Sequence, residues 1–127
     1  MKKNWYCVHA IFYFELMECA QDSYLVYENV YLIRAVNSEL AQKKIDRFAR
    51  SLQDFNERGT LLVGDAKARY LYKGVRKVIS PEEGSRFGNF CANQSMIELT
   101  YSVFEVDSWS DLCALVSGES VELNYVE

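Results

Sequence analysis

The sequence has few residues that interrupt a folded core. It contains one proline and six glycines among 127 residues, while half of its residues are hydrophobic and 14% are aromatic. This composition excludes a disordered or linker-rich chain, because the apolar content is large enough to offset the entropy of ordering a compact core. The length is that of one ordinary domain, so we expect residues 1–127 to form a single domain.

Histidine is almost absent, and the cysteines lack metal-type spacing. His9 is the only histidine, and the four cysteines, Cys7, Cys19, Cys91 and Cys113, form no C-x-x-C pair. Phosphate-binding glycine motifs are missing as well. We therefore expect no metal, no cofactor and no enzymatic activity. Cys7 and His9 share one strand face, an arrangement that a reactive pair or two metal ligands would also have, and we interpret it as ordinary sheet surface.

Long apolar runs are missing too. No segment approaches the ~18 apolar residues that a membrane-spanning helix needs. The mostly apolar start of the chain resembles a signal peptide, but His9 and Glu15 interrupt it, and Glu18 precedes Cys19 where a lipoprotein signal needs a small residue. We predict a first strand here and a cytoplasmic protein without membrane contact. Its cysteines are then expected to be small buried hydrophobic residues, and two disulfides are the alternative for an exported chain.

The first half of the chain predicts a hairpin followed by a helix. In the segment from Asn4 to Leu16 every even position after Asn4 is apolar, and Tyr24–Val36 is dense in Tyr, Val, Leu and Ile. This pattern favours two strands joined by a short polar turn. At Asn37 the hydrophobic spacing becomes helical. It predicts an amphipathic helix of about four turns that ends near Phe55 and covers the even face of the first strand.

The second half predicts further strands around a short helix. Leu61–Val63 is a candidate for a short strand, and Pro81–Ser95 is predicted to be a long loop. Gly74 indicates a bulge or a close backbone approach. Both tryptophans, Trp5 and Trp109, are expected in the core, and the alternative is that they are interface anchors. The remaining elements are strands at Lys67–Ile79, Met96–Val106 and Val121–Tyr125, and a short helix from Ser108 to Val116.

Together these elements predict an α+β domain of order β-β-α-β-β-α-β. We expect a mainly antiparallel sheet of about five strands, with one long helix packed on one face and a short second helix.

Charged residues are distributed unevenly along the chain. Residues 1–33 contain two basic and four acidic side chains, residues 34–77 contain eleven and five, and residues 78–127 contain one and nine. Such asymmetry often marks an interaction surface. The alternative is that the basic middle and the acidic end pair with each other inside the fold.

We interpret the acidic end as a binding patch for a cationic protein, because acidic patches steer basic partners and speed their association. If the last two long strands are neighbours, Glu98 and Glu122 share the solvated face. The predicted partner-binding residues are Glu98, Glu105, Asp107, Asp111, Glu119 and Glu122.

The basic middle supports an alternative, nucleic-acid binding, in which bases stack on Tyr70 and Tyr72. The net charge of −4 argues against this alternative. The predicted nucleic-acid-binding residues are Arg47, Arg50, Lys67, Arg69, Lys73, Arg76 and Lys77, with Lys43 beside them.

Several fragments of the chain resemble a small bacterial domain family of unknown function. They are the opening Asn4-Trp5-Tyr6, the helix after the long second strand, the run Gly74-Val75-Arg76-Lys77 and the tail from Tyr101 to Tyr125. The resemblance covers most of the chain and implies a bacterial, soluble, non-secreted protein. It brings no catalytic residues with it.

Small acidic α+β proteins of this kind also look like the immunity proteins that protect bacteria from toxins, an analogy of size and charge. Our hypothesis is a non-enzymatic protein-binding module, most specifically an immunity-type inhibitor that occludes the active site of a cognate toxin. The alternative is a nucleic-acid-binding accessory protein. Either a monomer or a homodimer joined through an edge strand agrees with the sequence.

Overall fold

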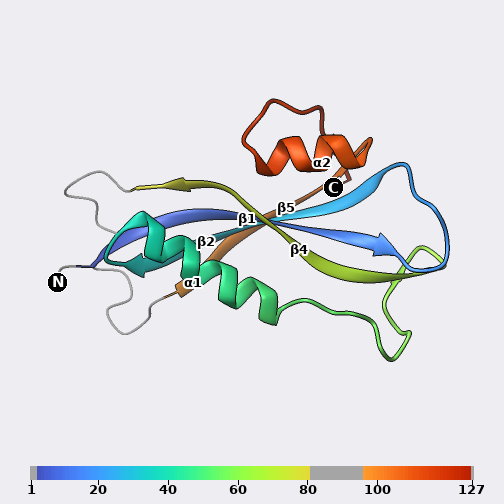
Figure 1. Cartoon of the computed structure of the whole chain (residues 1–127), viewed down its shortest axis with the longest axis horizontal. Coiled ribbons are helices and arrows are strands. Elements are labelled where there is room, and N and C mark those ends of the chain that lie inside the picture. The colour runs from blue at the N-terminus through green and yellow to red at the C-terminus, as the bar shows by residue number, and fades with distance from the viewer. Residues whose placement is uncertain (1–2, 81–95, 127) are drawn as a thin grey trace.

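The computed structural model describes residues 3–80 and 96–126. In this part of the chain the fold is α+β, with one antiparallel sheet between two helices (Figure 1). The predicted loop Pro81–Ser95 lies outside the described residues. Neither helix in the two described segments is long and apolar enough to cross a membrane.

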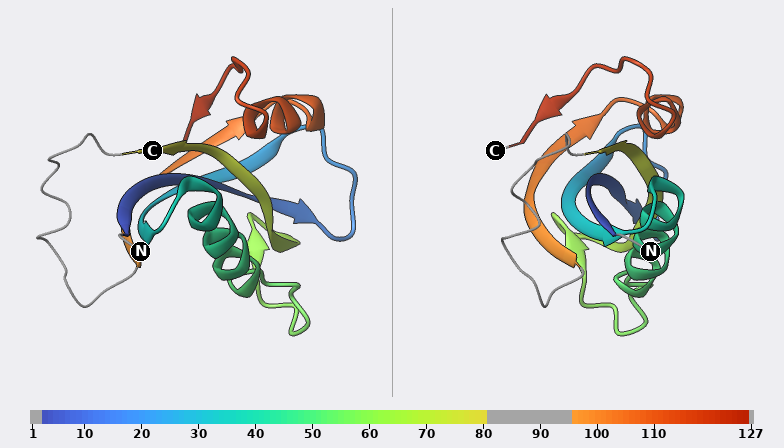
Figure 2. Two further views of the ribbon diagram at one scale, coloured as in Figure 1. Left: turned by 60° about the vertical axis from the view of Figure 1, so that its left-hand side comes forward. Right: turned by 90° about the vertical axis from the view of Figure 1, so that its left-hand side faces the viewer.

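The sheet has six strands in the order β3-β4-β1-β2-β5-β6, where about five were predicted. Four long strands form its body, and a two-residue strand lies at each edge. Figure 2 shows that the sheet is strongly curled, as expected for long strands that twist about one another. The long strands are β1 (Asn4–Leu16), β2 (Tyr24–Ala35), β4 (Ala66–Ile79) and β5 (Met96–Val106), and the edge strands are β3 (Leu62–Val63) and β6 (Asn124–Tyr125).

The predicted hairpin between the first two strands is confirmed, because β1 and β2 pair antiparallel along most of their length. Gln21 closes the connection between them. Its side-chain oxygen accepts a hydrogen bond from the Leu16 N–H at 2.8 Å, and its amide nitrogen donates to the Phe14 carbonyl at 3.1 Å. The side chain thereby pairs backbone groups that the short turn would otherwise leave unpaired.

The even face of β1 lies under α1 (Ser38–Ser51), which confirms the predicted contact. Small helix residues allow the helix to approach the sheet closely, and the aromatic rings of β1 fill the space between them. The buried residues of this contact are Tyr6, Val8, Ala10 and Phe12 from β1, and Ala41, Ile45 and Ala49 from α1.

Asn37 caps α1, and its side-chain oxygen accepts a hydrogen bond from the Leu40 N–H at 2.8 Å. The helix has 14 residues and ends before the predicted boundary near Phe55, so it is shorter than the long helix we expected. The backbone that follows pairs with β4 instead. Asp54 N–H donates to the Tyr70 carbonyl at 2.9 Å, and Tyr70 N–H donates back at 2.8 Å, which ends the helical hydrogen bonding.

The second helix, α2 (Trp109–Val116), covers part of the opposite face of the sheet. Ser108 caps it by accepting a hydrogen bond from the Asp111 N–H at 3.0 Å, as the sequence predicts. The buried residues of this contact are Leu112 and Leu115 from the helix, and Ile11, Tyr13, Val26, Phe104 and Val106 from the sheet.

The last strand is shorter than the predicted Val121–Tyr125. Val121 and Leu123 instead pack half-buried against the residues under α2, and β6 begins at Asn124. Tyr125 was expected to point inward, yet it is 65% exposed and meets the Phe104 ring edge-on. A strand at the edge of a sheet has one neighbour, which leaves this ring largely in solvent.

Gly74 marks both a bulge and a close approach, as its place in the sequence predicts. The register between β1 and β4 shifts beside it, and its φ is +151°. A Cβ atom at this position would lie 2.8 Å from Cγ1 of Val116. Glycine therefore allows α2 to pack directly on β4.

We expect Gly74→Ala to lower the free energy of unfolding by about 1–3 kcal/mol, because the added methyl group overlaps Val116 and pushes α2 from the sheet. Urea denaturation followed by circular dichroism measures the change. Gly64→Ala is the matched control, since Gly64 shares a positive φ of +61° but has nothing within 4 Å of the added carbon. Equal losses in the two variants would contradict the packing role of Gly74.

Candidate functional site

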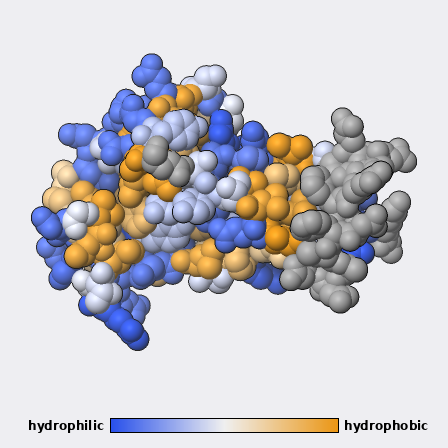
Figure 3. Space-filling view, turned by 180° about the vertical axis from the view of Figure 1, so that it is seen from behind, coloured by the Kyte–Doolittle hydropathy of each residue, from blue (hydrophilic) through white to orange (hydrophobic). Residues whose placement is uncertain are grey.

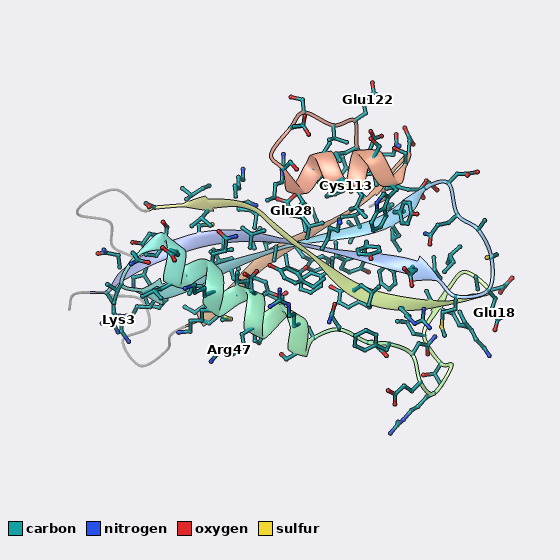
Figure 4. The ribbon with its side chains drawn as sticks, viewed as in Figure 1. Lys3, Glu18, Glu28, Arg47, Cys113 and Glu122 are labelled. Atoms are coloured by element: carbon teal, nitrogen blue, oxygen red, sulfur yellow. The ribbon has the colours of Figure 1, made fainter. Side chains whose placement is uncertain are left out.

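Four of the six predicted partner-binding carboxylates lie in one region, around α2. We name this region the acidic α2 layer. No lysine or arginine occurs among residues 96–126 to offset its charge. Figure 4 shows Glu122 beyond α2, on the opposite side of the sheet from Arg47. The acidic α2 layer consists of Asp107 and Asp111 at the start of α2, and Glu119 and Glu122 in the segment that follows the helix. Glu105 lies between Phe104 and Val106, which pack under α2, so it belongs to the other face of the sheet.

Glu98 is separated from this layer. Glu98 lies on β5, where it pairs with Tyr31 of β2. It precedes Glu105 by seven positions, so the two residues are roughly 20 Å apart along the extended strand. The strands β5 and β6 are neighbours, but they pair at Phe104 and Glu105 alone, and Glu122 lies before β6. The predicted sharing of one face by Glu98 and Glu122 is therefore wrong.

Three of the five basic residues of β4 pair with the first hairpin, whereas Lys73 lies over the ring of Trp109 at the start of α2. Glutamates at the turn end and in the middle of the hairpin lie across from them. No ion pair between described residues involves the acidic α2 layer. The three ion pairs between β4 and the first hairpin are Arg76–Glu28 at 3.0 Å, Arg69–Glu15 at 3.1 Å and Lys67–Glu18 at 3.9 Å. Part of the positive charge in the middle of the chain is thus offset by glutamates of the first hairpin. The negative charge of the acidic α2 layer is not offset by an ion pair between described residues.

Exposed aromatic residues accompany these carboxylates. Trp109, expected in the core, is 43% exposed, because only one side of its ring packs, on Tyr13 and Tyr24 at 5.5 Å. Lys73 lies over the ring at 4.5 Å, a cation–π contact. Tyr125 is exposed as well, and the view from behind shows hydrophobic patches among hydrophilic ones (Figure 3). Aromatic residues beside charges are typical of protein interfaces.

The predicted nucleic-acid-binding residues do not form one surface. Arg47 and Arg50 are exposed on α1 and, with Lys43, line a shallow depression. Arg69 and Lys77 belong instead to the opposite face of the sheet, where they pair across from Glu15 and His9.

Tyr70 and Tyr72 are not stacking platforms, which corrects the sequence-based expectation. Their rings lie 5.0 and 5.4 Å from the Phe12 ring, within the hydrophobic contact under α1. The Tyr72 hydroxyl donates a hydrogen bond to Asp46 on α1. Burial raises the pKa of both phenols well above its usual value, and the hydrogen bond to Asp46 raises the pKa of Tyr72 further.

A polar cluster lies at the centre of the sheet, and the sequence analysis found only part of it. It placed Cys7 and His9 on one strand face but missed their partners, Glu28 and Arg76. Glu28 on β2 is only 7% exposed. One of its oxygens lies 2.6 Å from Nδ1 of His9, and the other accepts a hydrogen bond from Arg76 at 3.0 Å. Cys7 Sγ lies 3.9 Å from Nε2 of the same histidine. A lone glutamate within the apolar run of β2 was the available signal, but its partners depend on strand order and on the bulge beside Arg76.

The cysteines differ from the expectation of small buried residues. Cys7 and Cys113 are half-buried and Cys19 is exposed, and all three are free thiols, while Cys91 lies outside the described residues. Burial raises the pKa of Cys7, and the charge of Lys77 lowers it in part. No group of three histidine, cysteine or acidic residues in the described segments is arranged to hold a metal ion.

Buried phenols make the stability of the fold sensitive to alkaline pH. The unfolded chain releases its tyrosine protons near pH ~10, whereas the raised pKa of Tyr72 keeps its proton in the fold. The folded state then binds more protons, so the free energy of unfolding falls as pH rises above about 10.

We expect Tyr72→Phe to flatten this decline by about 1.4 kcal/mol per pH unit, measured by urea denaturation in alkaline buffers. Tyr70→Phe removes the second phenol whose pKa is raised, and it is expected to flatten the decline as well. An unchanged slope in both variants would contradict the burial of these hydroxyl groups as its cause.

Comparison of the chain with protein-family models, with curated proteins and with solved structures finds no match.

Proposed function

We propose that the chain is a protein-binding module whose acidic α2 layer covers a cationic surface of its partner, as an immunity-type inhibitor of a bacterial toxin does. One observation carries the proposal: three basic residues of β4 pair with glutamates of the first hairpin, and the acidic α2 layer has no ion-pair partner among the described residues. The layer is therefore available to a basic surface.

The physical properties of the layer suit fast and specific association. Carboxylates that lack internal partners produce a field that steers a basic protein toward them. The exposed rings of Trp109 and Tyr125 supply the kind of aromatic contact that most often dominates binding energy once water is excluded. A module of this kind needs no cofactor, and a cytoplasmic location suits an inhibitor that meets a toxin inside the cell.

The proposal predicts slower association after charge reversal in the acidic α2 layer. The variant replaces Asp107, Asp111, Glu119 and Glu122 with lysine. Its association rate constant is expected to fall at least tenfold at low salt, and the difference is expected to shrink as ionic strength rises. The measurement is stopped-flow or surface-plasmon binding to the toxin domain that the proposal expects in the neighbouring upstream gene.

The matched control reverses four exposed acids outside the layer, Asp22, Glu39, Glu57 and Asp65. It changes the net charge equally and is expected to slow association much less. Equal effects of the two variants would contradict the acidic α2 layer as the contact. A gene neighbourhood of metabolic enzymes, with no toxin-bearing reading frame, would contradict the inhibitor itself.

The second candidate function is nucleic-acid binding through α1. The observation that favours it is the exposed row of Lys43, Arg47 and Arg50, which lines one depression on the helix. These residues lie three and four positions apart, so they share one side of the helix.

Under this second candidate, single-stranded RNA binds at low salt and its affinity falls steeply with salt concentration. Filter binding measures both. The double variant Arg47→Glu and Arg50→Glu is expected to abolish retention of the RNA. Charge reversal at the exposed Lys67 on β4, Lys67→Glu, is expected to leave this retention unchanged. Failure to retain RNA at low salt would overturn this candidate and leave the protein-binding proposal intact.

A further inference from the structure

Cys7, His9 and Glu28 form a polar cluster on the central strands. They are arranged as a nucleophile, a general base and an acid that orients the base. Glu28 accepts at Nδ1 of His9, which places the proton of a neutral imidazole on Nδ1 and leaves the lone pair of Nε2 toward Cys7. The separation of 3.9 Å between Sγ and Nε2 is within the reach of a hydrogen bond to sulfur. The three side chains therefore form one connected path for a proton.

The supporting residues hold this path rigidly. Glu28 is buried, and a buried carboxylate is stable only with good partners. Arg76 supplies the second partner from β4 and keeps the other oxygen of Glu28 occupied. Because β4, β1 and β2 are adjacent strands in the body of the sheet, the positions of all four side chains are set by paired strands, with Arg76 at a bulge of β4, rather than by loops.

The thiol can be reached from solvent. Cys7 is half-buried, and the side chain of His9 keeps 16% of its surface exposed. Next to them on β4, Lys77 pairs opposite His9 and Ile79 pairs opposite Cys7, and both of these residues are exposed. Figure 4 places Glu28 on the side of the sheet that carries α2. Burial raises the pKa of Cys7 and the charge of Lys77 lowers it in part, so the thiol needs a base to react. The exposed charge of Lys77 on the same face favours an anionic molecule there.

We propose that Cys7 is a nucleophile toward small anionic acyl esters or thioesters, with His9 as its general base. Glu28 orients His9, and Arg76 positions Glu28. This activity goes beyond the proposed binding function and does not depend on it, because none of the four residues belongs to the acidic α2 layer.

The reaction proceeds in two steps, acylation of Cys7 and hydrolysis of the resulting thioester. The thiol proton passes to Nε2 of His9 while Sγ bonds to the acyl carbon, and the bond to the leaving oxygen or sulfur breaks as that atom takes the proton from His9. Water then attacks the thioester on Cys7 and gives its proton to His9. The carboxylic acid departs, and the sulfur regains its proton. The exposed ammonium group of Lys77 lies on the same face and stabilises the negative oxygen of each intermediate.

The test uses the full chain with Cys7 as its only thiol, in the background Cys19→Ser, Cys91→Ser and Cys113→Ser. The probes are 4-nitrophenyl acetate and the anionic mono-4-nitrophenyl succinate. Nitrophenolate release and the mass of the acylated protein report the reaction. The reference is the chain that keeps Cys19 as its only thiol. This thiol is exposed, and His9, the only histidine of the sequence, contacts Cys7 instead.

We expect the Cys7 chain to react at least tenfold faster than the Cys19 chain at neutral pH. His9→Asn is expected to remove this advantage and to react only in alkaline solution, as the thiol ionises. Lys77→Gln, an exposed change, is expected to slow both esters, and the anionic ester more, because it loses the attraction of its own charge as well as the stabilisation of the negative oxygen. A purely structural ion pair would not produce this pH profile or this ester preference.

Two results would overturn the proposal. The first is a Cys7 chain that reacts no faster than the Cys19 chain. The second is a His9→Asn chain that is folded by circular dichroism and still reacts at the parent rate. If His9→Asn does not fold, Glu28→Gln decides instead, because it keeps an oxygen for Arg76 and removes the charge that orients His9. An unchanged rate in that variant also overturns the proposal.

Discussion

The central position of β1 is the constraint on which the rest of the structure depends. This strand pairs with β2 on one side and β4 on the other, and each of its faces packs under a different helix. Its even residues meet α1, while Ile11 and Tyr13 meet α2. A strand buried on both faces has little freedom to shift, because a slip by one residue would exchange its two sets of side chains. The register of the neighbouring strands follows from it.

The separation of charge follows from the same arrangement. The helices lie on opposite sides of the sheet (Figure 1), so the basic row on α1 and the carboxylates around α2 face away from each other. Three basic residues of β4 pair with glutamates of the first hairpin, and Lys73 lies over the ring of Trp109. Two surfaces of opposite sign remain on one small domain, and the acidic one also carries exposed aromatic rings.

The side of the sheet that carries α2 is divided in two. One part is covered by the helix, and Gly74 permits that contact. The other part contains Cys7 and His9 over the buried Glu28. A buried carboxylate with two cationic or polar partners is a costly feature of a core, and its presence at the centre of an otherwise apolar strand is what distinguishes this part from ordinary sheet surface.

By itself the sequence determined the element types and the local signals: the alternation of β1, the caps Asn37 and Ser108, the close approach at Gly74 and the acidic end. These depend on neighbours within a few residues, so they are visible in the chain. Only the tertiary structure decided where α1 ends, which acids pair with β4, and which side chains meet Glu28. Those outcomes depend on strand order and on bulges, through which residues far apart in the chain become neighbours, and no periodicity along the sequence records them.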